Sequence, residues 1–175
     1  MDGRIAVLAS GVGSNLQALI DDQFCGQRIA LVVSDQPKAR ALDRAKDADI
    51  ETAVIEFDSF PDRPAFSAAI LEALETRGVT HVALAGFMRV LSSGFVDSFR
   101  GRILNVHPSL LPAFPGANSV QTALDHGVKV TGVTVHLVNE ELDGGPIVLQ
   151  EAIPILRYDD WDTLEARINH MEHRL

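Results

Sequence analysis

The chain has 175 residues and carries 24 acidic and 15 basic side chains, so its net charge is −9 with the histidines neutral. Hydrophobic residues make up 46% of the chain and charged residues 22%, a composition typical of one compact domain. The basic residues are scattered, which disfavours binding along a nucleic-acid backbone. A single cysteine, Cys25, excludes an intrachain disulfide and a cysteine-rich zinc site.

The apolar runs are short. The longest, such as 5–9 and 29–33, fall well below the roughly 20 residues that span a bilayer, so we expect no membrane helix. Residues 1–4 lead directly into a strand-like run and lack the longer apolar region of a signal peptide. We therefore expect a cytoplasmic protein.

Short apolar runs alternate with amphipathic stretches along the whole chain. This alternation predicts an α/β fold with a mostly parallel, twisted sheet flanked by helices and one domain spanning residues 1–175. In chain order we expect strands at 4–9, 28–33, 51–55, 81–85 and 102–106, and a C-terminal hairpin formed by 129–138 and 146–154. We expect helices after residue 14 and at 38–47, 64–76, 92–99, 119–126 and 160–174.

A glycine turn joins the first strand to the first helix. Residues 10–14 read SGVGS, in which Gly11 and Gly13 allow a ligand to approach the backbone closely. The helix that follows presents unpaired N–H groups, and Ser14 and Asn15 add side-chain donors. The turn lacks the third glycine of a dinucleotide fingerprint and the Gly-Lys-Ser/Thr ending of a nucleotide P-loop. Phosphate binding and a simple capped turn remain equally open from this motif.

Asn105 and His107 stand two residues apart at the end of a predicted strand, so an extended backbone places both on one face. Pro108 favours that extended conformation at His107. An amide and an imidazole at the carboxyl end of a strand can donate hydrogen bonds to an oxygen that becomes negative during acyl transfer. As an isolated pair they are more typical of residues that tie down an irregular loop, so the pair alone does not establish a catalytic role.

Asp143 lies in the predicted hairpin loop, between Leu142 and two glycines. From there its carboxylate could reach His107, while Thr134 and His136 share one face of the preceding strand. An ordinary turn aspartate is the alternative. The remaining histidines show no joint spacing with acids or with Cys25, so we expect no metal site.

Four ordered blocks together carry a resemblance. They are residues 9–18 (ASGVGSNLQA), 84–91 (LAGFMRVL), 105–112 (NVHPSLLP) and 141–146 (ELDGGP). The chain resembles the phosphoribosylglycinamide formyltransferase family over nearly its whole length, and the first block separates this family from other formyltransferases. The resemblance implies a Rossmann-like formyltransferase fold.

The resemblance also implies an activity, which is transfer of the formyl group of 10-formyltetrahydrofolate to the amine of glycinamide ribonucleotide in purine (IMP) biosynthesis. It implies that Asn105 and His107 stabilise the oxyanion and that Asp143 assists proton transfer. The folate is a cosubstrate, and no metal is required. The expected partners are these small molecules, with no nucleic acid and no membrane, and the expected chain is a monomer or homodimer.

The resemblance implies two sets of binding residues. The phosphoribosyl ligand is expected at Gly13, Ser14, Asn15, Arg63 and Glu172. The folate is expected at Leu84, Met88, Arg89, Val90, Leu91, Phe95, Val96, Ile103, Val138, Asn139 and Glu140.

Two departures from the family pattern affect these expectations. Residues 116–120 (GANSV) lack a histidine that family members often carry there, and the chain stops at Leu175, where relatives usually continue. A truncated chain and a naturally short one both fit this ending. The alternatives in function are a formyltetrahydrofolate hydrolase, another amine formyltransferase, and a non-catalytic sensor of folate or a phosphoribosyl ligand.

Overall fold

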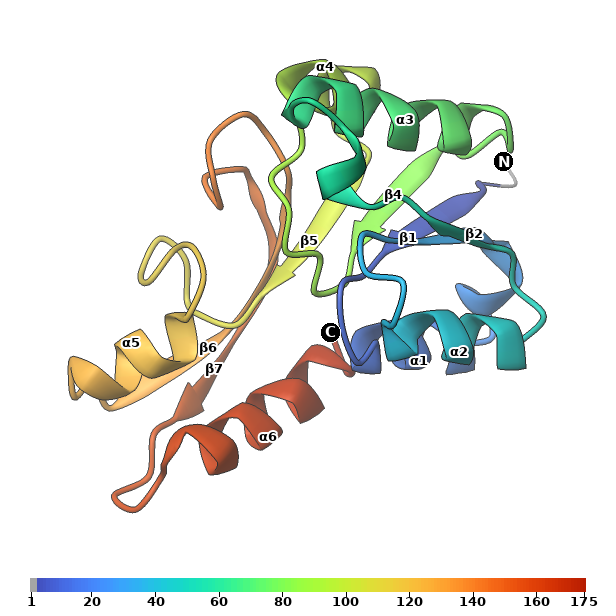
Figure 1. Cartoon of the computed structure of the whole chain (residues 1–175). Coiled ribbons are helices and arrows are strands. Elements are labelled where there is room, and N and C mark those ends of the chain that lie inside the picture. Colours follow the sequence, from blue (N-terminus) through green and yellow to red (C-terminus); the bar gives the residue numbers. More distant parts are fainter. Residues whose placement is uncertain (1–2) are drawn as a thin grey trace. The chain divides into compact units, whose positions relative to one another are not determined.

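The computed structural model describes residues 3–175, which form two compact units that meet in the sequence at Ile103 and Leu104 (Figure 1). The strands of the first unit are β1 (Ile5–Leu8), β2 (Ile29–Ser34), β3 (Thr52–Val54) and β4 (His81–Leu84). Its helices are α1 (Ser14–Asp21), α2 (Arg40–Asp47), α3 (Arg63–Glu75) and α4 (Ser93–Ser98), with 3₁₀ turns at Gly26–Arg28 and Phe57–Ser59.

The sheet of the first unit runs in the order β3-β2-β1-β4, and its paired strands are parallel. The chain builds outward from β1 to β3 and then returns to place β4 on the other side of β1. This reversal makes the β1/β4 boundary a switch point, where the connections after the two strands diverge. Ligands of parallel α/β sheets bind at the carboxyl end of such a boundary.

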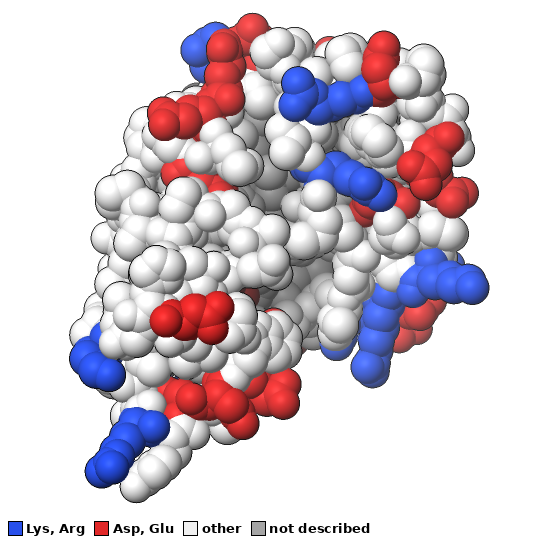
Figure 2. All heavy atoms as spheres, turned by 60° about the vertical axis from the view of Figure 1, so that its left-hand side comes forward, with Lys and Arg blue, Asp and Glu red and all other residues white. Residues whose placement is uncertain are grey.

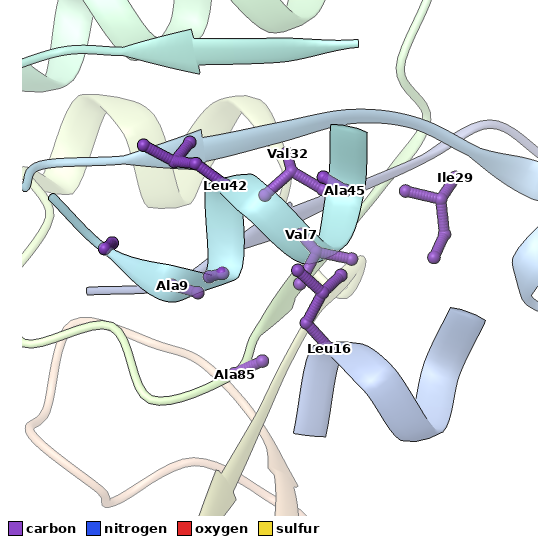
Figure 3. Close-up of a cluster of buried hydrophobic side chains, with 10 residues drawn as sticks. Val7, Ala9, Leu16, Ile29, Val32, Leu42, Ala45 and Ala85 are labelled. Atoms are coloured by element: carbon purple, nitrogen blue, oxygen red, sulfur yellow. The ribbon is translucent and has the colours of Figure 1, made fainter. Parts of the chain in front are cut away.

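The core of the first unit forms because β1 and β2 are apolar on both faces. Val7, Val32, Leu16 and Leu42 meet in one buried cluster, so that α1 and α2 cover the same face of the sheet (Figure 3). Helices α3 and α4 lie on the opposite face (Figure 1), where α3 buries Phe66, Ile70 and Leu74 at a helical spacing.

The second unit contributes antiparallel strands to the seven-stranded sheet and carries two helices. It contains β5 (Ile103–His107), α5 (Ser119–Asp125), β6 (Val130–Leu137), β7 (Ile147–Pro154) and α6 (Trp161–Glu172). Strand β6 pairs with β5 on one side and with β7 on the other. Both helices contribute to one buried cluster with β6 and β7, which includes Val120, Val133, Ile153, Leu164 and Ile168.

The register of β5 against β6 determines which polar side chains of the second unit lie opposite one another. Asn105 stands opposite His136, and His107 stands opposite Thr134. The sequence predicted a strand that ends at Val106, whereas β5 extends to His107 because the pairing with Thr134 continues the ladder. His107 is therefore held by a strand and not by the loop that follows.

The other predicted elements are confirmed, with bounds that differ by at most a few residues at their ends. The predicted C-terminal hairpin is β6 and β7. Within residues 3–175, no helix combines the length and the apolar character needed to cross a bilayer. On the face shown in Figure 2, Lys and Arg side chains are interspersed with Asp and Glu and do not gather into one basic patch.

Candidate active site

Asn105 is oriented by a histidine on the neighbouring strand. The Asn105 Nδ2 atom lies 3.1 Å from His136 Nε2, and His136 Nδ1 lies 3.1 Å from the Leu137 carbonyl oxygen. Because a carbonyl only accepts, His136 carries its proton on Nδ1, and its Nε2 accepts a hydrogen bond from the Asn105 amide. This assignment directs the Nδ2 group of Asn105 toward His136 and leaves its second N–H for another acceptor.

His107 is buried and uses both ring nitrogens. Its Nε2 lies 2.9 Å from the Phe114 carbonyl oxygen, to which it donates, and its Nδ1 lies 3.5 Å from Asp143 Oδ2. The Nδ1 side of the His107 ring therefore faces the Asp143 carboxylate. The predicted meeting of these two residues is present in the structure.

Asp143 completes the cluster from the hairpin loop between β6 and β7. Its side chain is only 9% exposed, and its Oδ1 lies 3.6 Å from His136 Nε2. Its Oδ2 accepts a hydrogen bond of 2.7 Å from the Gly116 N–H. The backbone of Asp143 has a φ of 52°, a left-handed conformation that is uncommon for a residue with a side chain and occurs where the surroundings enforce it.

A buried threonine secures the loop that follows β5. The Thr134 hydroxyl donates to the Ser109 carbonyl at 2.7 Å and accepts from the Leu111 N–H at 3.1 Å. Gln150 on β7 donates to both Thr134 Oγ1 and the Leu111 carbonyl, each at 2.9 Å. Side chains of β6 and β7 thus hold the backbone of residues 109–111 in one conformation.

Sequence reasoning missed His136, Thr134 and Gln150 as members of this site. The signal available was the shared face of Thr134 and His136, because their alternation on one strand points both at the same neighbour. What the pattern lacked was the register between β5 and β6, which pairs residues 31 positions apart.

The glycine turn after β1 is held from outside by α2. The Ala41 N–H donates to the Gly11 carbonyl at 3.1 Å, and Arg44 Nε donates to the Val12 carbonyl at 2.9 Å. Gly13 caps α1 with a φ of 73°, and Ser14 and Asn15 form the first positions of the helix. The turn therefore ends at a helix start whose first N–H groups have no partner within the helix, which is a site suited to an anion.

The other two residues predicted for the phosphoribosyl ligand lie at helix ends. Arg63 is the first residue of α3 and is exposed, after the N-cap Asp62, whose side chain accepts from the Ala65 N–H at 2.8 Å. Glu172 is the last residue of α6 and is partly buried. Arg63 belongs to the first unit and Glu172 to the second.

The residues predicted to contact the folate differ in exposure. Met88 and Val90 are 70% and 53% exposed, and Asn139 and Glu140 are exposed on the hairpin loop. Leu84, Arg89 and Val138 are partly buried. Four others are buried within the protein: Leu91, Phe95, Val96 and Ile103. Of the predicted set, the buried side chains belong to the core of the protein, and the others reach its surface.

Within residues 3–175, no group of three or more His, Cys, Asp or Glu side chains is arranged to hold a metal ion. The polar cluster built around Asn105 and His107 instead offers hydrogen-bond donors and one carboxylate. Donors of this kind stabilise negative charge on an oxygen, and a nearby carboxylate accepts protons. An α/β fold with such a cluster at the end of a strand is typical of enzymes that transfer acyl groups.

Comparison with known proteins identifies the family within this class. Residues 3–175 match the family model described as formyl transferase, and the chain belongs to this family. The structure of glycinamide ribonucleotide transformylase 1 from Symbiobacterium toebii is 47% identical, with a TM-score of 0.95 over 98% of this chain and 82% of that one. The predicted α/β fold class is thereby confirmed.

Two curated relatives are also similar over the chain. Phosphoribosylglycinamide formyltransferase of Bacillus subtilis is 42% identical over 174 residues, which cover 98% of this chain and 89% of the relative. The trifunctional purine biosynthetic protein adenosine-3 of Bos taurus is 48% identical over 175 residues. This chain spans only 17% of that trifunctional protein.

Proposed function

We propose that this chain transfers the formyl group of 10-formyltetrahydrofolate to the amine of glycinamide ribonucleotide, a step of purine biosynthesis. The observation that carries the proposal is the convergence of Asn105, His107 and Asp143 at one end of β5, with His136 accepting a hydrogen bond from the Asn105 amide. The formyl transferase family membership and the names of the relatives support it.

In the proposed reaction, the Asn105 amide donates its second N–H to the formyl oxygen as the substrate amine attacks the formyl carbon. The new C–N bond forms, negative charge collects on the oxygen, and the amide stabilises it because the donor is already oriented by His136. Asp143 accepts the proton of the attacking nitrogen, directly or through water. Collapse of the intermediate breaks the bond to N10, which takes up a proton and leaves as tetrahydrofolate.

His107 becomes the second oxyanion donor only after a change of partner. Its Nε2–H is held by the Phe114 carbonyl, and its Nδ1 faces Asp143. The Phe114 carbonyl must therefore give way to the formyl oxygen when the substrates bind. Phe114 has a φ of 53°, an uncommon left-handed conformation, and a rotation of its peptide would release the His107 N–H.

We assign the phosphoribosyl ligand to Gly13, Ser14 and Asn15 at the start of α1, with Arg63 and Glu172 as its further contacts. The pteridine of the folate is assigned to the exposed and partly buried residues after β4, including Met88, Arg89 and Val90, and Val138, Asn139 and Glu140 are its further expected contacts. A heterocycle binds well where apolar side chains surround a few polar groups. Residues 1–175 would act as one formyltransferase domain in the cytoplasm, without a metal.

Turnover tests this proposal directly. The purified chain is mixed with 10-formyltetrahydrofolate, with and without glycinamide ribonucleotide, and tetrahydrofolate and free formate are followed separately. Ribonucleotide-dependent formation of tetrahydrofolate without free formate is expected. Formate release without the ribonucleotide would indicate a hydrolase, and binding without turnover would indicate a sensor.

Substitution of Asn105 tests the assigned role of the amide. Asn105→Ala removes one oxyanion donor and should lower kcat by at least about 100-fold, which corresponds to about 3 kcal/mol of barrier. Its KM for both substrates should change far less, because the interaction is made mainly in the transition state. An Asn105→Ala variant with nearly full kcat would remove the amide from the mechanism.

A further inference from the structure

Three turns of the first unit meet at the carboxyl ends of its adjacent strands. Ser10 follows β1, Asp35 follows β2 directly, and Met88 and Arg89 follow β4. Because the strand order is β2-β1-β4, these turns lie side by side around the switch point. The Ser10 turn continues into the glycine turn assigned to the phosphate, and the β4 turn carries residues assigned to the folate.

Hydrogen bonds join the Ser10 turn to the β4 turn. The Met88 N–H donates to Ser10 Oγ at 2.9 Å, and the Ser10 N–H donates to the Gly86 carbonyl at 3.1 Å. Because Ser10 Oγ accepts from Met88, its own proton is directed to Asp35 Oδ1 at 2.5 Å. The serine hydroxyl thus connects the backbone of the β4 turn to the Asp35 carboxylate.

The second oxygen of Asp35 binds the same turn through a side chain. Arg89 Nε donates to Asp35 Oδ2 at 2.8 Å, and Gln36 Nε2 donates to the same oxygen at 3.1 Å. The Arg89 guanidinium also lies 4.8 Å from the centre of the Phe57 ring. Asp35, Ser10, Met88 and Arg89 therefore form a closed ring in which both oxygens of the Asp35 carboxylate accept hydrogen bonds.

The Asp35 carboxylate is nearly inaccessible, with 1% of its side chain exposed. Burial alone raises the pKa of such a group, but hydrogen bonds from Ser10, Arg89 and Gln36 outweigh it and hold the pKa of Asp35 below its ordinary value. The group is charged at neutral pH, and separating a buried charge from its partners is costly. The ring consequently restrains the β4 turn strongly.

We propose that Asp35 is a positioning residue that holds the turn of residues 86–89 against Ser10 and thereby shapes the folate site. The effect on ligand binding rests on the proposed function, because that function assigns the folate to this turn. The restraint on the turn rests on the hydrogen bonds alone. These two parts are tested by separate measurements.

The test compares Asp35→Asn with a matched control, Asp159→Asn. Asp159 also pairs with an arginine, with 2.5 Å between its Oδ2 and Arg167 Nη1, and 6% of its side chain is exposed. Calorimetry with tetrahydrofolate measures binding, and steady-state kinetics measures kcat and KM. Asp35→Asn should weaken tetrahydrofolate binding and raise KM for the formyl donor by about tenfold, as expected for loss of hydrogen bonds to a charged group.

The control variant, and the comparison of kcat with KM, distinguish a positioning role from a general loss of stability. Asp159→Asn should leave tetrahydrofolate affinity within about twofold of the original chain, and Asp35→Asn should change kcat far less than KM. Tetrahydrofolate affinity that is unchanged in Asp35→Asn would overturn the proposal. So would an equal loss in the two variants.

Hydrogen exchange of residues 85–91 tests the restraint without any ligand. Asp35→Asn should speed exchange of the Met88 amide, whereas Asp159→Asn should not. Equal exchange would overturn the positioning role. If the original chain fails to bind tetrahydrofolate, the proposed function fails while the exchange result still decides this restraint.

A second variant covers the case in which Asp35→Asn does not fold. Ser10→Ala keeps the Asp35–Arg89 ion pair and removes only the hydroxyl that connects Met88 to Asp35. It should also speed exchange at Met88 and weaken tetrahydrofolate binding. An unchanged Met88 amide in Ser10→Ala would overturn the proposal.

Discussion

At the scale of single residues, the site depends on which atom of each side chain donates and which accepts. The Leu137 carbonyl determines the tautomer of His136, and His136 in turn determines the direction of the Asn105 amide. His136 therefore controls how the Asn105 amide is oriented. Supporting hydrogen bonds of this kind hold a functional group near its productive geometry.

His136→Ala tests this dependence. The variant removes the acceptor for Asn105, so the amide loses its orientation and kcat should fall by about tenfold, the value of one ordinary hydrogen bond. Steady-state kinetics measures the effect, with KM changing less than kcat. His81→Ala serves as the control, because His81 is exposed at the start of β4. A kcat within about twofold of the original would contradict the role of His136.

The lowered pKa of Asp35 also makes the stability of the folded chain depend on pH. Its pKa in the folded chain lies below the ordinary value of 3.8, so its stabilising contribution is complete above that value and is lost as the pH falls through the folded pKa. Urea unfolding measured from neutral to acidic pH should show a shallower loss of stability in Asp35→Asn than in the original chain. Parallel curves for the two proteins would contradict this prediction.

At the scale of elements, the connection between β1 and α1 has one position that only glycine can occupy. A Cβ atom on Gly13 would lie 2.8 Å from both Cα and Cβ of Ala41, and the φ of Gly13 is 73°. A Cβ at Gly11 would meet no atom within 4 Å. The two glycines of the same turn therefore have different roles.

Gly13→Ala should shift α1 away from α2 and destabilise the fold by about 1–3 kcal/mol, because it adds both a contact that is too short and a strained backbone. The same variant should lose binding of ribose 5-phosphate, measured by calorimetry. Gly11→Ala is the matched control for folding and should keep the stability of the original chain in urea. Equal stabilities for the two variants would contradict this account of the turn.

The helix α6 begins with a complete capping arrangement. The Asp160 side chain accepts from the Thr163 N–H at 2.9 Å, and the Thr163 hydroxyl accepts from the Asp160 N–H at 3.0 Å. The Thr163 N–H and the Thr163 hydroxyl both donate to the Asp160 carboxylate and lower its pKa, so the cap is present above the ordinary carboxyl pKa and weakens in acid. The arrangement explains why α6 begins at Trp161, directly after Asp160.

At the scale of the whole molecule, the chain is acidic while both proposed ligands carry negative groups. A net charge of −9 opposes the approach of anions at long range. Binding therefore depends on local donors, such as the start of α1 and the Asn105 amide. Ligand binding to the folded chain should then be visible as a gain in thermal stability.

Glycinamide ribonucleotide at 100 times its Kd should stabilise the folded chain by about 2.7 kcal/mol. For a chain of this size, that gain corresponds to an increase in Tm of about 5–10 °C. Thermal unfolding followed by circular dichroism measures it, and ribose 5-phosphate, which lacks the amine side, should give a smaller shift at equal concentration. No shift with the ribonucleotide would contradict the assigned ligand.

The sequence by itself determined the elements and the face on which each side chain lies. Alternation in strands and helical spacing are local properties, so the strands, the helices and the shared face of Asn105 and His107 could be predicted from neighbouring residues. The glycine turn and the hairpin loop of Asp143 could be predicted for the same reason. Local sequence restricts backbone conformation wherever glycine, proline or a capping side chain is present.

Only the tertiary structure decided which of these side chains meet and through which atoms. His136 reaches Asn105 because of the register between β5 and β6, and Asp35 reaches Arg89 because β1 lies between β2 and β4. Both contacts join residues far apart in the chain. Their geometry depends on strand order, register and rotamers, which are set by packing of the whole sheet and cannot be obtained from any local pattern.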